Sequence, residues 1–165
     1  MAIREKNGKR RTLKILLLLT VLMIWGHSML PAEQSGAESG WALALLQGLL
    51  DALGIPLTLS EYLVRKAAHF SEYALLGLEL GLLLLPGFFE MHAAADRLRA
   101  LAGPPALSAL TAFADETIQL FTPGRDGKIQ DMWIDTAGSL CGTLAALAVL
   151  ALLRRQAGKK RGGVS

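Results

Sequence analysis

The sequence predicts an all-α integral membrane protein: a bundle of four transmembrane helices with one short amphipathic helix outside the membrane. Hydrophobic residues make up 52% of the 165-residue chain, and its mean hydropathy is +0.39. Both values are high for a soluble globular domain. Aromatic residues contribute only 6%. The apolar content is therefore mainly Leu and Ala, which is typical of helices in lipid rather than of β structure.

The composition also indicates which partners and cofactors are not expected. The pI near 9.2 reflects basic residues that lie mostly at the two ends of the chain. Because basic and aromatic residues do not alternate in the middle, we expect no nucleic-acid partner. The one cysteine, Cys141, lies in an apolar run and is expected to be buried. The sequence has no C-x-x-C or Cys/His zinc pattern, so we predict no metal and no cofactor.

The chain begins with a basic segment, residues 1–12, which we expect to be a disordered cytoplasmic tail. The apolar run Leu13–Leu30 is predicted to be the first transmembrane helix. A helix of that length extends about 27 Å, just enough for a bilayer core. The alternative is a signal peptide, with Ser35-Gly36-Ala37 as a small-residue cleavage site.

A connector, residues 31–60, follows the first span. Pro31–Gly40 is expected to form turns. Trp41–Leu53 is apolar but too short to cross a bilayer, so it predicts a helix on the outer membrane surface with Trp41 at headgroup level. A segment that dips into the membrane and returns is the alternative. Gly54-Ile55-Pro56 ends this helix.

Three further spans are expected. Ser60 is the predicted N-cap of the second, whose apolar part, 67–89, should end or kink at Pro86. Residues 90–99 are the polar loop before the third span. The remaining segments are the third span at Leu101–Phe121 with its entry distorted by Pro104-Pro105, the fourth span at Trp133–Leu153, and a basic, unstructured tail at residues 154–165. Residues 13–153 thus form one four-helix membrane domain between two basic cytoplasmic tails.

The basic residues predict an orientation. Thirteen of the seventeen Lys and Arg residues lie in the N-terminal segment, the 90–99 loop and the C-terminal tail. The other four are Arg65, Lys66, Arg125 and Lys128. Because cytoplasmic segments are enriched in Lys and Arg, both termini are predicted to be cytoplasmic.

Polar residues gather at the predicted outer ends of three spans. On an ideal helix, Arg65, His69, Glu72 and Glu79 share one face of the second span. Asp115 and Gln119 share a stripe on the third, and Glu116 flanks it. On the fourth, Asp131 and Asp135 lie on the face of Gly138, Gly142 and Ala146, whose spacing favours close helix packing. The two aspartates are therefore expected to point into the bundle.

Three interpretations of this outer polar cluster remain open. The first is an ion-pair network that locks the helix ends. The second is a binding site for a headgroup, phosphate or peptide. The third is a hydrolytic or metal site in which His69 and Glu72, an i, i+3 pair, act with further acids. No established catalytic motif supports the third, so we favour a protein without enzymatic activity.

Three further polar residues lie outside this cluster. Glu79 lies well inside the second span, where an acid is expected to be neutral or hydrogen-bonded to Ser108, Thr111 or Thr143. His27 is expected to be interfacial. His92 is expected to be solvated in the cytoplasmic loop.

The outer cluster also carries a family resemblance. The segment 65–77, with R-K-A-A-H-F-S-E-Y followed by L-G, resembles the R-K-x-x-H-F-x-E-Y-x-x-L-G block of the VanZ-like family. The segment 115–138 is similar to that family's D-E-x-x-Q…P-x-R…D…D-x-x-G block. The first span, with Trp25 and Ser28, fits the resemblance loosely. The residues that match these motifs, together with Arg65, are the candidate ligand-binding residues: Arg65, Lys66, His69, Glu72, Tyr73, Asp115, Glu116, Gln119, Arg125, Asp131 and Asp135.

The resemblance implies a small multi-pass protein of the bacterial cytoplasmic membrane, in a family associated with teicoplanin (glycopeptide) resistance. The leading hypothesis is that the outer cluster binds a membrane lipid or a lipid-linked cell-wall precursor and thereby modulates glycopeptide susceptibility. One alternative is a membrane-embedded hydrolase or transferase that uses His69, Glu72, Asp115 and Glu116. Another is a structural scaffold. Association into a homo-oligomer is left open.

Overall fold

The computed structural model describes residues 2–162 and confirms the all-α class. Within that range the chain contains no β-strand. Its elements are α1 (Ala2–Ser28), α2 (Ala32–Ala52), α3 (Glu61–Leu84), a short 3-10 helix (Phe88–Glu90), α4 (Ala94–Leu120) and α5 (Ile129–Gly162).

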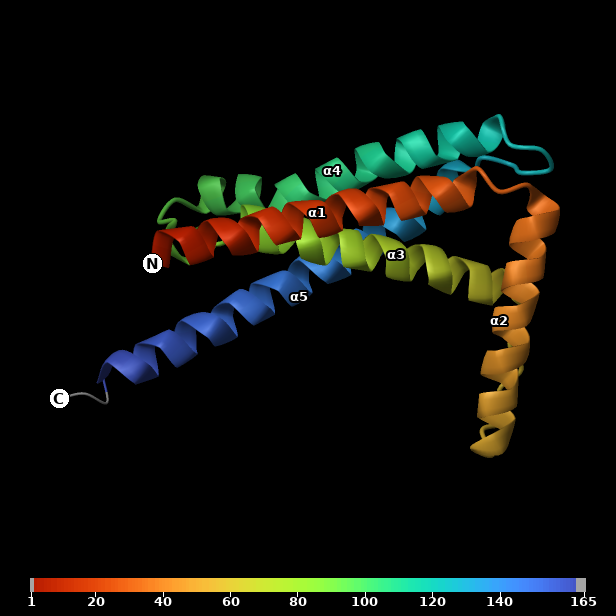
Figure 1. Ribbon diagram of the computed structural model, residues 1–165, viewed down its shortest axis with the longest axis horizontal. Coiled ribbons are helices and arrows are strands. Elements are labelled where there is room, and N and C mark those ends of the chain that lie inside the picture. The colour runs from red at the N-terminus through yellow and green to blue at the C-terminus, as the bar shows by residue number, and fades with distance from the viewer. Residues whose placement is uncertain (1, 163–165) are drawn as a thin grey trace.

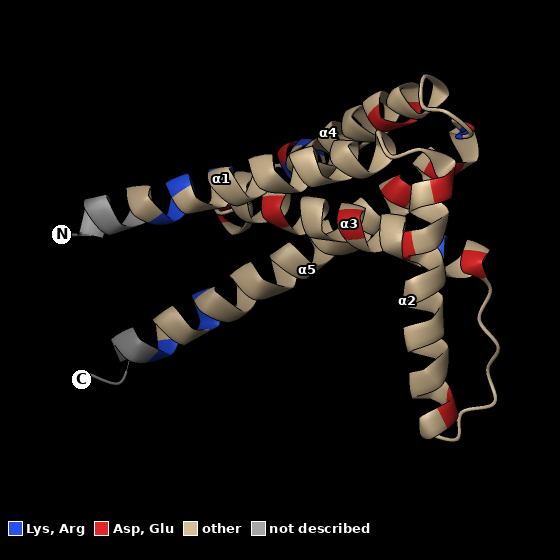
Figure 2. Cartoon of the chain, turned by 45° about the vertical axis from the view of Figure 1, so that its right-hand side comes forward, with Lys and Arg blue, Asp and Glu red and all other residues tan. Residues whose placement is uncertain are grey.

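Four of the five α-helices form a bundle, and the fifth crosses one end of it. Figure 1 shows α1, α3 and α4 side by side, with α5 passing beneath α3 and diverging toward its C-terminal end. Both termini lie at one end of the bundle, and α2 lies crosswise at the other. Acidic residues gather near α2, whereas basic residues mark the N-terminal part of α1 and the C-terminal part of α5 (Figure 2).

The α3–α5 contact is the most extensive in the bundle, and glycines on both helices make it close. A Cβ added at Gly138 would overlap the Phe70 carbonyl, and one at Gly142 would overlap the Ala74 carbonyl. On α3, a Cβ at Gly77 would overlap the backbone of Ser139. The prediction that the small-residue face packs against protein is therefore confirmed.

Three helices within the described range are long and apolar enough to cross a membrane: Asn7–Ser28, Glu61–Leu84 and Ile129–Lys159. α4 is not among them, although it has 27 residues. It begins with Asp96, Arg97 and Arg99 and ends with Asp115 and Glu116, which lower its hydropathy. Many large apolar side chains on the bundle nevertheless face outward, as expected for a surface in contact with lipid.

The predicted basic tails are helical, which corrects the expectation of disorder. α1 begins at Ala2, and α5 continues through the basic segment to Gly162. Lys, Arg, Glu and Ala are good helix formers, and each segment extends a helix that has already been nucleated by its apolar part. Residues 163–165 of the predicted C-terminal tail lie outside the described range.

Two predicted irregular segments are also helical. Most of the predicted turn at 31–40 is the first half of α2, because Pro31 precedes the helix and fixes its entry. α4 begins at Ala94, so only residues 91–93 of the predicted 90–99 loop are irregular, and Pro104 and Pro105 lie inside the helix.

The predicted ends of α3 are confirmed, and one prediction about α5 is wrong. The Ser60 side chain accepts a hydrogen bond from the Leu63 amide, and the helix ends immediately before Leu85 and Pro86. Cys141, in contrast, is exposed rather than buried. It lies off the glycine face of α5, which is the face that packs against α3.

Candidate functional site

The outer cluster forms at the α2 end of the bundle, where the start of α3, the end of α4 and the start of α5 meet. A cavity of about 330 Å³ opens between them. A second cavity, of about 200 Å³, extends toward α2. Arg65, His69 and Arg125 line both cavities. The first is also lined by Lys66 and Lys128, together with Glu61, Gln119, Asp126 and Asp131.

The turn between α4 and α5 forms one wall of this site and is fixed at both ends. The Thr122 hydroxyl donates to the Ser28 carbonyl at 2.9 Å, which ties the turn to the end of α1. Gly124 has a positive φ of 72°, a conformation that glycine adopts without strain. The Lys128 amide donates to Glu116 Oε2 at 2.6 Å and closes the turn onto α4.

Two basic residues of α3 have carboxylate partners. Lys66 Nζ lies 2.5 Å from Asp131 Oδ2 on α5, and both side chains are largely buried. Arg65 Nη2 lies 2.7 Å from Glu61 Oε1, one turn earlier on its own helix. Asp131 thus pairs with Lys66 and not with Arg125. The turn directs Arg125 toward α2 instead.

Arg125 is a partly buried basic residue that lines both cavities. Its Nη1 donates to Ser35 Oγ on α2 at 2.7 Å. It forms no ion pair with any carboxylate in the described part of the chain. Burial lowers the pKa of the Arg125 guanidinium, and the charge of Arg65 lowers it further. An arginine remains charged under such a shift. The site therefore holds a partly buried cation that Asp115, Glu116 and Asp131 attract through space without forming an ion pair with it.

The end of α1 supplies partners that the sequence analysis missed. The Ser28 hydroxyl donates to Asp115 Oδ1 at 2.5 Å, and Gln119 donates to both of these side chains. His27 Nδ1 lies 2.7 Å from Glu72 Oε1. The signals for Ser28 were its place as a polar residue at the end of an apolar span and the loose fit of that span to the family resemblance. Ser35, the partner of Arg125, had none, because its segment was expected to form turns.

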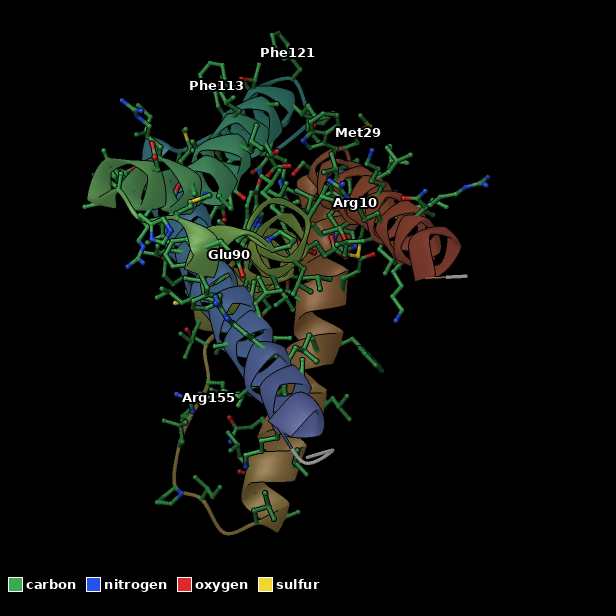
Figure 3. All side chains as sticks on the ribbon, turned by 90° about the vertical axis from the view of Figure 1, so that its left-hand side faces the viewer. Arg10, Met29, Glu90, Phe113, Phe121 and Arg155 are labelled. Carbon is green, nitrogen blue, oxygen red and sulfur yellow. The ribbon has the colours of Figure 1, made fainter. Side chains whose placement is uncertain are left out.

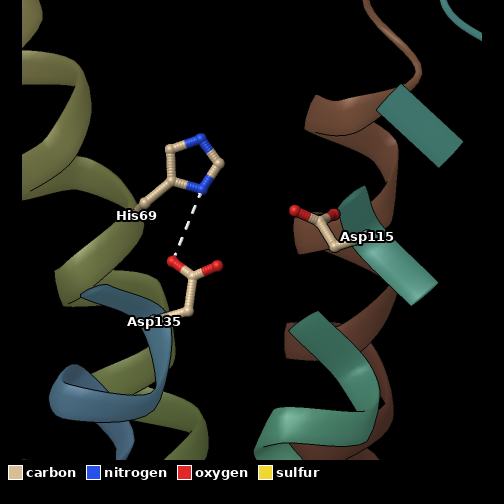
Figure 4. Close-up of side chains that lie close together, drawn as sticks. All are labelled: His69, Asp115 and Asp135. Atoms are coloured by element: carbon tan, nitrogen blue, oxygen red, sulfur yellow. Dashed lines mark ion pairs between the residues drawn. The ribbon is translucent and has the colours of Figure 1, made fainter. Parts of the chain in front are cut away.

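A buried inner group lies behind the cavity and consists of His69 on α3, Asp115 on α4 and Asp135 on α5. Figure 4 shows the three side chains pointing into a common space. Ligand atoms of all three lie within 4.8 Å of one another, and His69 Nδ1 is 3.9 Å from Asp135 Oδ1. Both aspartates have an exposed fraction of 0%, and for Asp135 this burial was expected from the glycine face of α5. Glu72 does not belong to this group, because it pairs with His27.

Other candidate residues are buried nearby with incomplete hydrogen bonding. Tyr73 is fully buried one helical turn after His69, and its hydroxyl has no hydrogen-bond partner. Glu116 uses one carboxylate oxygen for Lys128, and the other has no partner. Farther inside, Glu79 accepts a hydrogen bond from Thr20 on α1 at 3.2 Å. The three partners expected for Glu79 were therefore wrong, because α1 rather than α4 or α5 faces it.

Comparisons with known proteins and the apolar helices both indicate a membrane protein. Neither the curated proteins nor the solved structures contain a significant match. A protein-family model described as VanZ/LLP1 matches residues 13–152, which is most of the chain. Together with the three apolar helices, this match identifies a helical membrane protein. The chain belongs to the VanZ/LLP1 family.

Proposed function

We propose that α4 is a fourth transmembrane helix, between α3 and α5 in chain order. With 27 residues, it extends about 40 Å, more than the thickness of a bilayer core. Leu110 and Phe113 in its middle are 67% and 62% exposed, and Phe113 projects away from the bundle (Figure 3). Its acids Asp115 and Glu116 are buried against protein. An outward apolar surface and inward acids are the pattern expected of a span.

α2 is proposed to lie on the outer membrane surface. None of its residues is buried within the protein, and Trp41, Leu45, Leu49 and Leu53 form an exposed stripe at helical spacing. A helix that lies across the end of a bundle with an exposed apolar stripe is suited to the headgroup region. Residues 13–153 then form the membrane domain, and both termini are cytoplasmic.

This topology is testable by labelling of single cysteines in whole cells. The native Cys141 is first replaced by serine. Asp126→Cys, in the exposed outer turn, should react with an impermeant maleimide added outside, whereas Gln156→Cys should react only after lysis. Both positions are exposed, so access from either side depends on topology alone. Labelling of Gln156→Cys in intact cells, with no labelling of Asp126→Cys, would refute the orientation.

For the outward cavity, we propose that it binds a phosphate-bearing lipid headgroup, from either a phospholipid or a lipid-linked cell-wall precursor. The observation that carries this proposal is Arg125. Its guanidinium lines the cavity and, within the described part of the chain, hydrogen-bonds to the neutral Ser35 without forming an ion pair. A planar guanidinium matches phosphate oxygens through paired hydrogen bonds. Lys128 lines the same cavity and adds positive charge, whereas the charge of Arg65 is paired with Glu61.

Binding is tested with the full chain in nanodiscs of neutral lipid. One arm adds phosphatidylglycerol, and the other adds a polyprenyl diphosphate-linked disaccharide, with bound lipid measured by native mass spectrometry. Arg125→Ala should weaken binding by about tenfold to a hundredfold, the loss expected for one charge-assisted contact of 1.5–3 kcal/mol. The control is Arg99→Ala. Arg99 is exposed and pairs with Asp96 near the start of α4. Equal affinity in both variants would contradict the proposal.

Sequestering of such a headgroup in the bacterial envelope would alter glycopeptide susceptibility, as the family association implies. The scaffold alternative rests on the Lys66–Asp131 and His27–Glu72 contacts, which join helices without any ligand. The two functions differ in one outcome. A scaffold keeps its full stability and function in Arg125→Ala, whereas a headgroup-binding protein loses lipid and function together.

A further inference from the structure

The inner group of His69, Asp115 and Asp135 has the geometry of a metal-binding site. Nitrogen and oxygen ligands bound to one ion at about 2.1 Å lie roughly 3 to 4 Å apart. The 3.9 Å between His69 Nδ1 and Asp135 Oδ1 is within that range. All three ligand atoms lie within 4.8 Å of one another, so small side-chain rotations suffice to bring them around one ion. The three ligands come from three different helices.

The buried oxygens of Asp135 point to a missing partner. Its side chain is fully buried, and neither carboxylate oxygen has a hydrogen-bond partner. His69 Nδ1 is also buried without one. Buried polar atoms almost always have partners, and a carboxylate left without one is costly. Figure 4 shows these atoms directed at the space that the three side chains share.

The hydrogen bonds of Asp115 are also of the kind that orient a metal ligand. Ser28 and Gln119 hydrogen-bond to its carboxylate. These donors are neutral, so they orient Asp115 without neutralising it, as the outer partners of metal ligands do. Arg125 acts on the charge of Asp115 through space but forms no ion pair with it. The nearby cation Lys66 is already paired with Asp131. A divalent ion would balance the two buried carboxylates of Asp115 and Asp135.

We propose that His69, Asp115 and Asp135 bind one divalent transition-metal ion of the Zn²⁺ or Mn²⁺ class. One imidazole nitrogen with two carboxylates suits these ions better than Ca²⁺, which prefers oxygen ligands alone. Three protein ligands leave further coordination positions for small molecules. Because His69 also lines both cavities, such positions are reached from the outer surface. The ion joins α3, α4 and α5 at a point where their own side chains leave polar atoms unsatisfied.

Metal content of the full-length protein tests the assignment. The chain is purified in detergent with a streptavidin-binding tag, because a polyhistidine tag binds these ions, and is stripped with a chelator. After equilibration with Zn²⁺ or Mn²⁺, elemental analysis should give about one ion per chain. Asp135→Asn should weaken binding by at least about tenfold. Glu72→Gln should retain it, because Glu72 is a neighbouring acid that pairs with His27.

A second measurement, the visible absorption of bound Co²⁺, tests whether His69 is a metal ligand. Co²⁺ bound to the wild-type protein should give visible absorption bands that change in His69→Gln. The assignment is overturned if folded wild-type protein binds no ion, as it would if Asp115 and Asp135 shared a proton instead. Equal binding by the wild type and Asp135→Asn, or unchanged Co²⁺ bands in His69→Gln, also overturns it. If Asp135→Asn does not fold, Asp115→Asn replaces it. Arg125→Ala should keep the metal, so this inference and the proposed lipid binding fail separately.

Discussion

Replacement of Gly142 with alanine adds one methyl group where α3 and α5 touch backbone to backbone. A Cβ at this position would overlap the carbonyl of Ala74 and approach the amide nitrogen of Leu78. Both are backbone atoms of the neighbouring helix, so no side-chain rotation makes room for the methyl group. The two helices must separate, and the contact that orients Asp135 and His69 should loosen.

The expected change in the free energy of unfolding of Gly142→Ala is the sum of two opposing effects. Alanine in a helix is favoured over glycine by about 0.5–1 kcal/mol. Forcing an extra carbon into a well-packed contact costs about 1–3 kcal/mol. The free energy of unfolding should therefore fall by roughly 1–2 kcal/mol. Gly26 in α1 is the matched control, because a Cβ there would meet nothing within 4 Å. Gly26→Ala should leave stability unchanged or raise it by up to about 1 kcal/mol.

The assay is reversible unfolding in mixed micelles, with sodium dodecyl sulfate as denaturant and helix content followed by circular dichroism. The comparison between Gly142→Ala and Gly26→Ala removes effects common to any added methyl group. A difference of about 1–3 kcal/mol in the predicted direction supports the close contact. Equal stability of the two variants would refute the reasoning that the glycine face of α5 packs on the α3 backbone.

Two further changes test the polar end of the bundle in the same assay. Ser28→Ala removes a donor to the buried Asp115 and should cost roughly 1–3 kcal/mol, whereas Ser71→Ala, whose hydroxyl bonds only within its own helix, should change stability by about 0.5 kcal/mol or less. Similar losses in both would contradict the structure. Lys66→Met should destabilise by about 1–3 kcal/mol, because it leaves the largely buried Asp131 without its partner. The exchange Lys66→Asp with Asp131→Lys should recover most of that loss, and failure to recover would show that more than pairing is involved.

The sequence predicts which side of a helix packs inside the bundle and where a helix ends. The spacing of Gly138, Gly142 and Ala146 predicted the packed side of α5, and the same register placed Asp135 inside the bundle. Ser60 and Pro86 predicted the ends of α3. These features are local, because they depend on helical periodicity and on backbone chemistry that a single residue changes. Such local features can therefore be predicted from a short stretch of sequence.

The hydrogen-bond partner of a side chain depends on which helix lies opposite. The sequence did not predict those partners correctly. Periodicity gives the direction of a side chain but not the helix that faces it. Glu79 was therefore given candidate partners on α4 and α5 rather than Thr20 on α1, and no partner was predicted for Arg125, which bonds to Ser35. The helical 31–40 segment was missed because its Gly and Ser residues favour turns in isolation, whereas Pro31 at the start fixes a helix.

The structure separates two roles that the sequence assigned to one cluster. At the α2 end of the bundle, ion pairs such as Lys66–Asp131 satisfy their members and join helices without a ligand. Behind them, His69 and Asp135 keep buried polar atoms that no protein group satisfies. Since burial without a partner is costly, the inner residues are the ones whose presence a locking role fails to explain. An ion-pair network therefore accounts for the outer layer of the cluster, whereas the inner layer keeps the unsatisfied atoms that the proposed metal ion would bind.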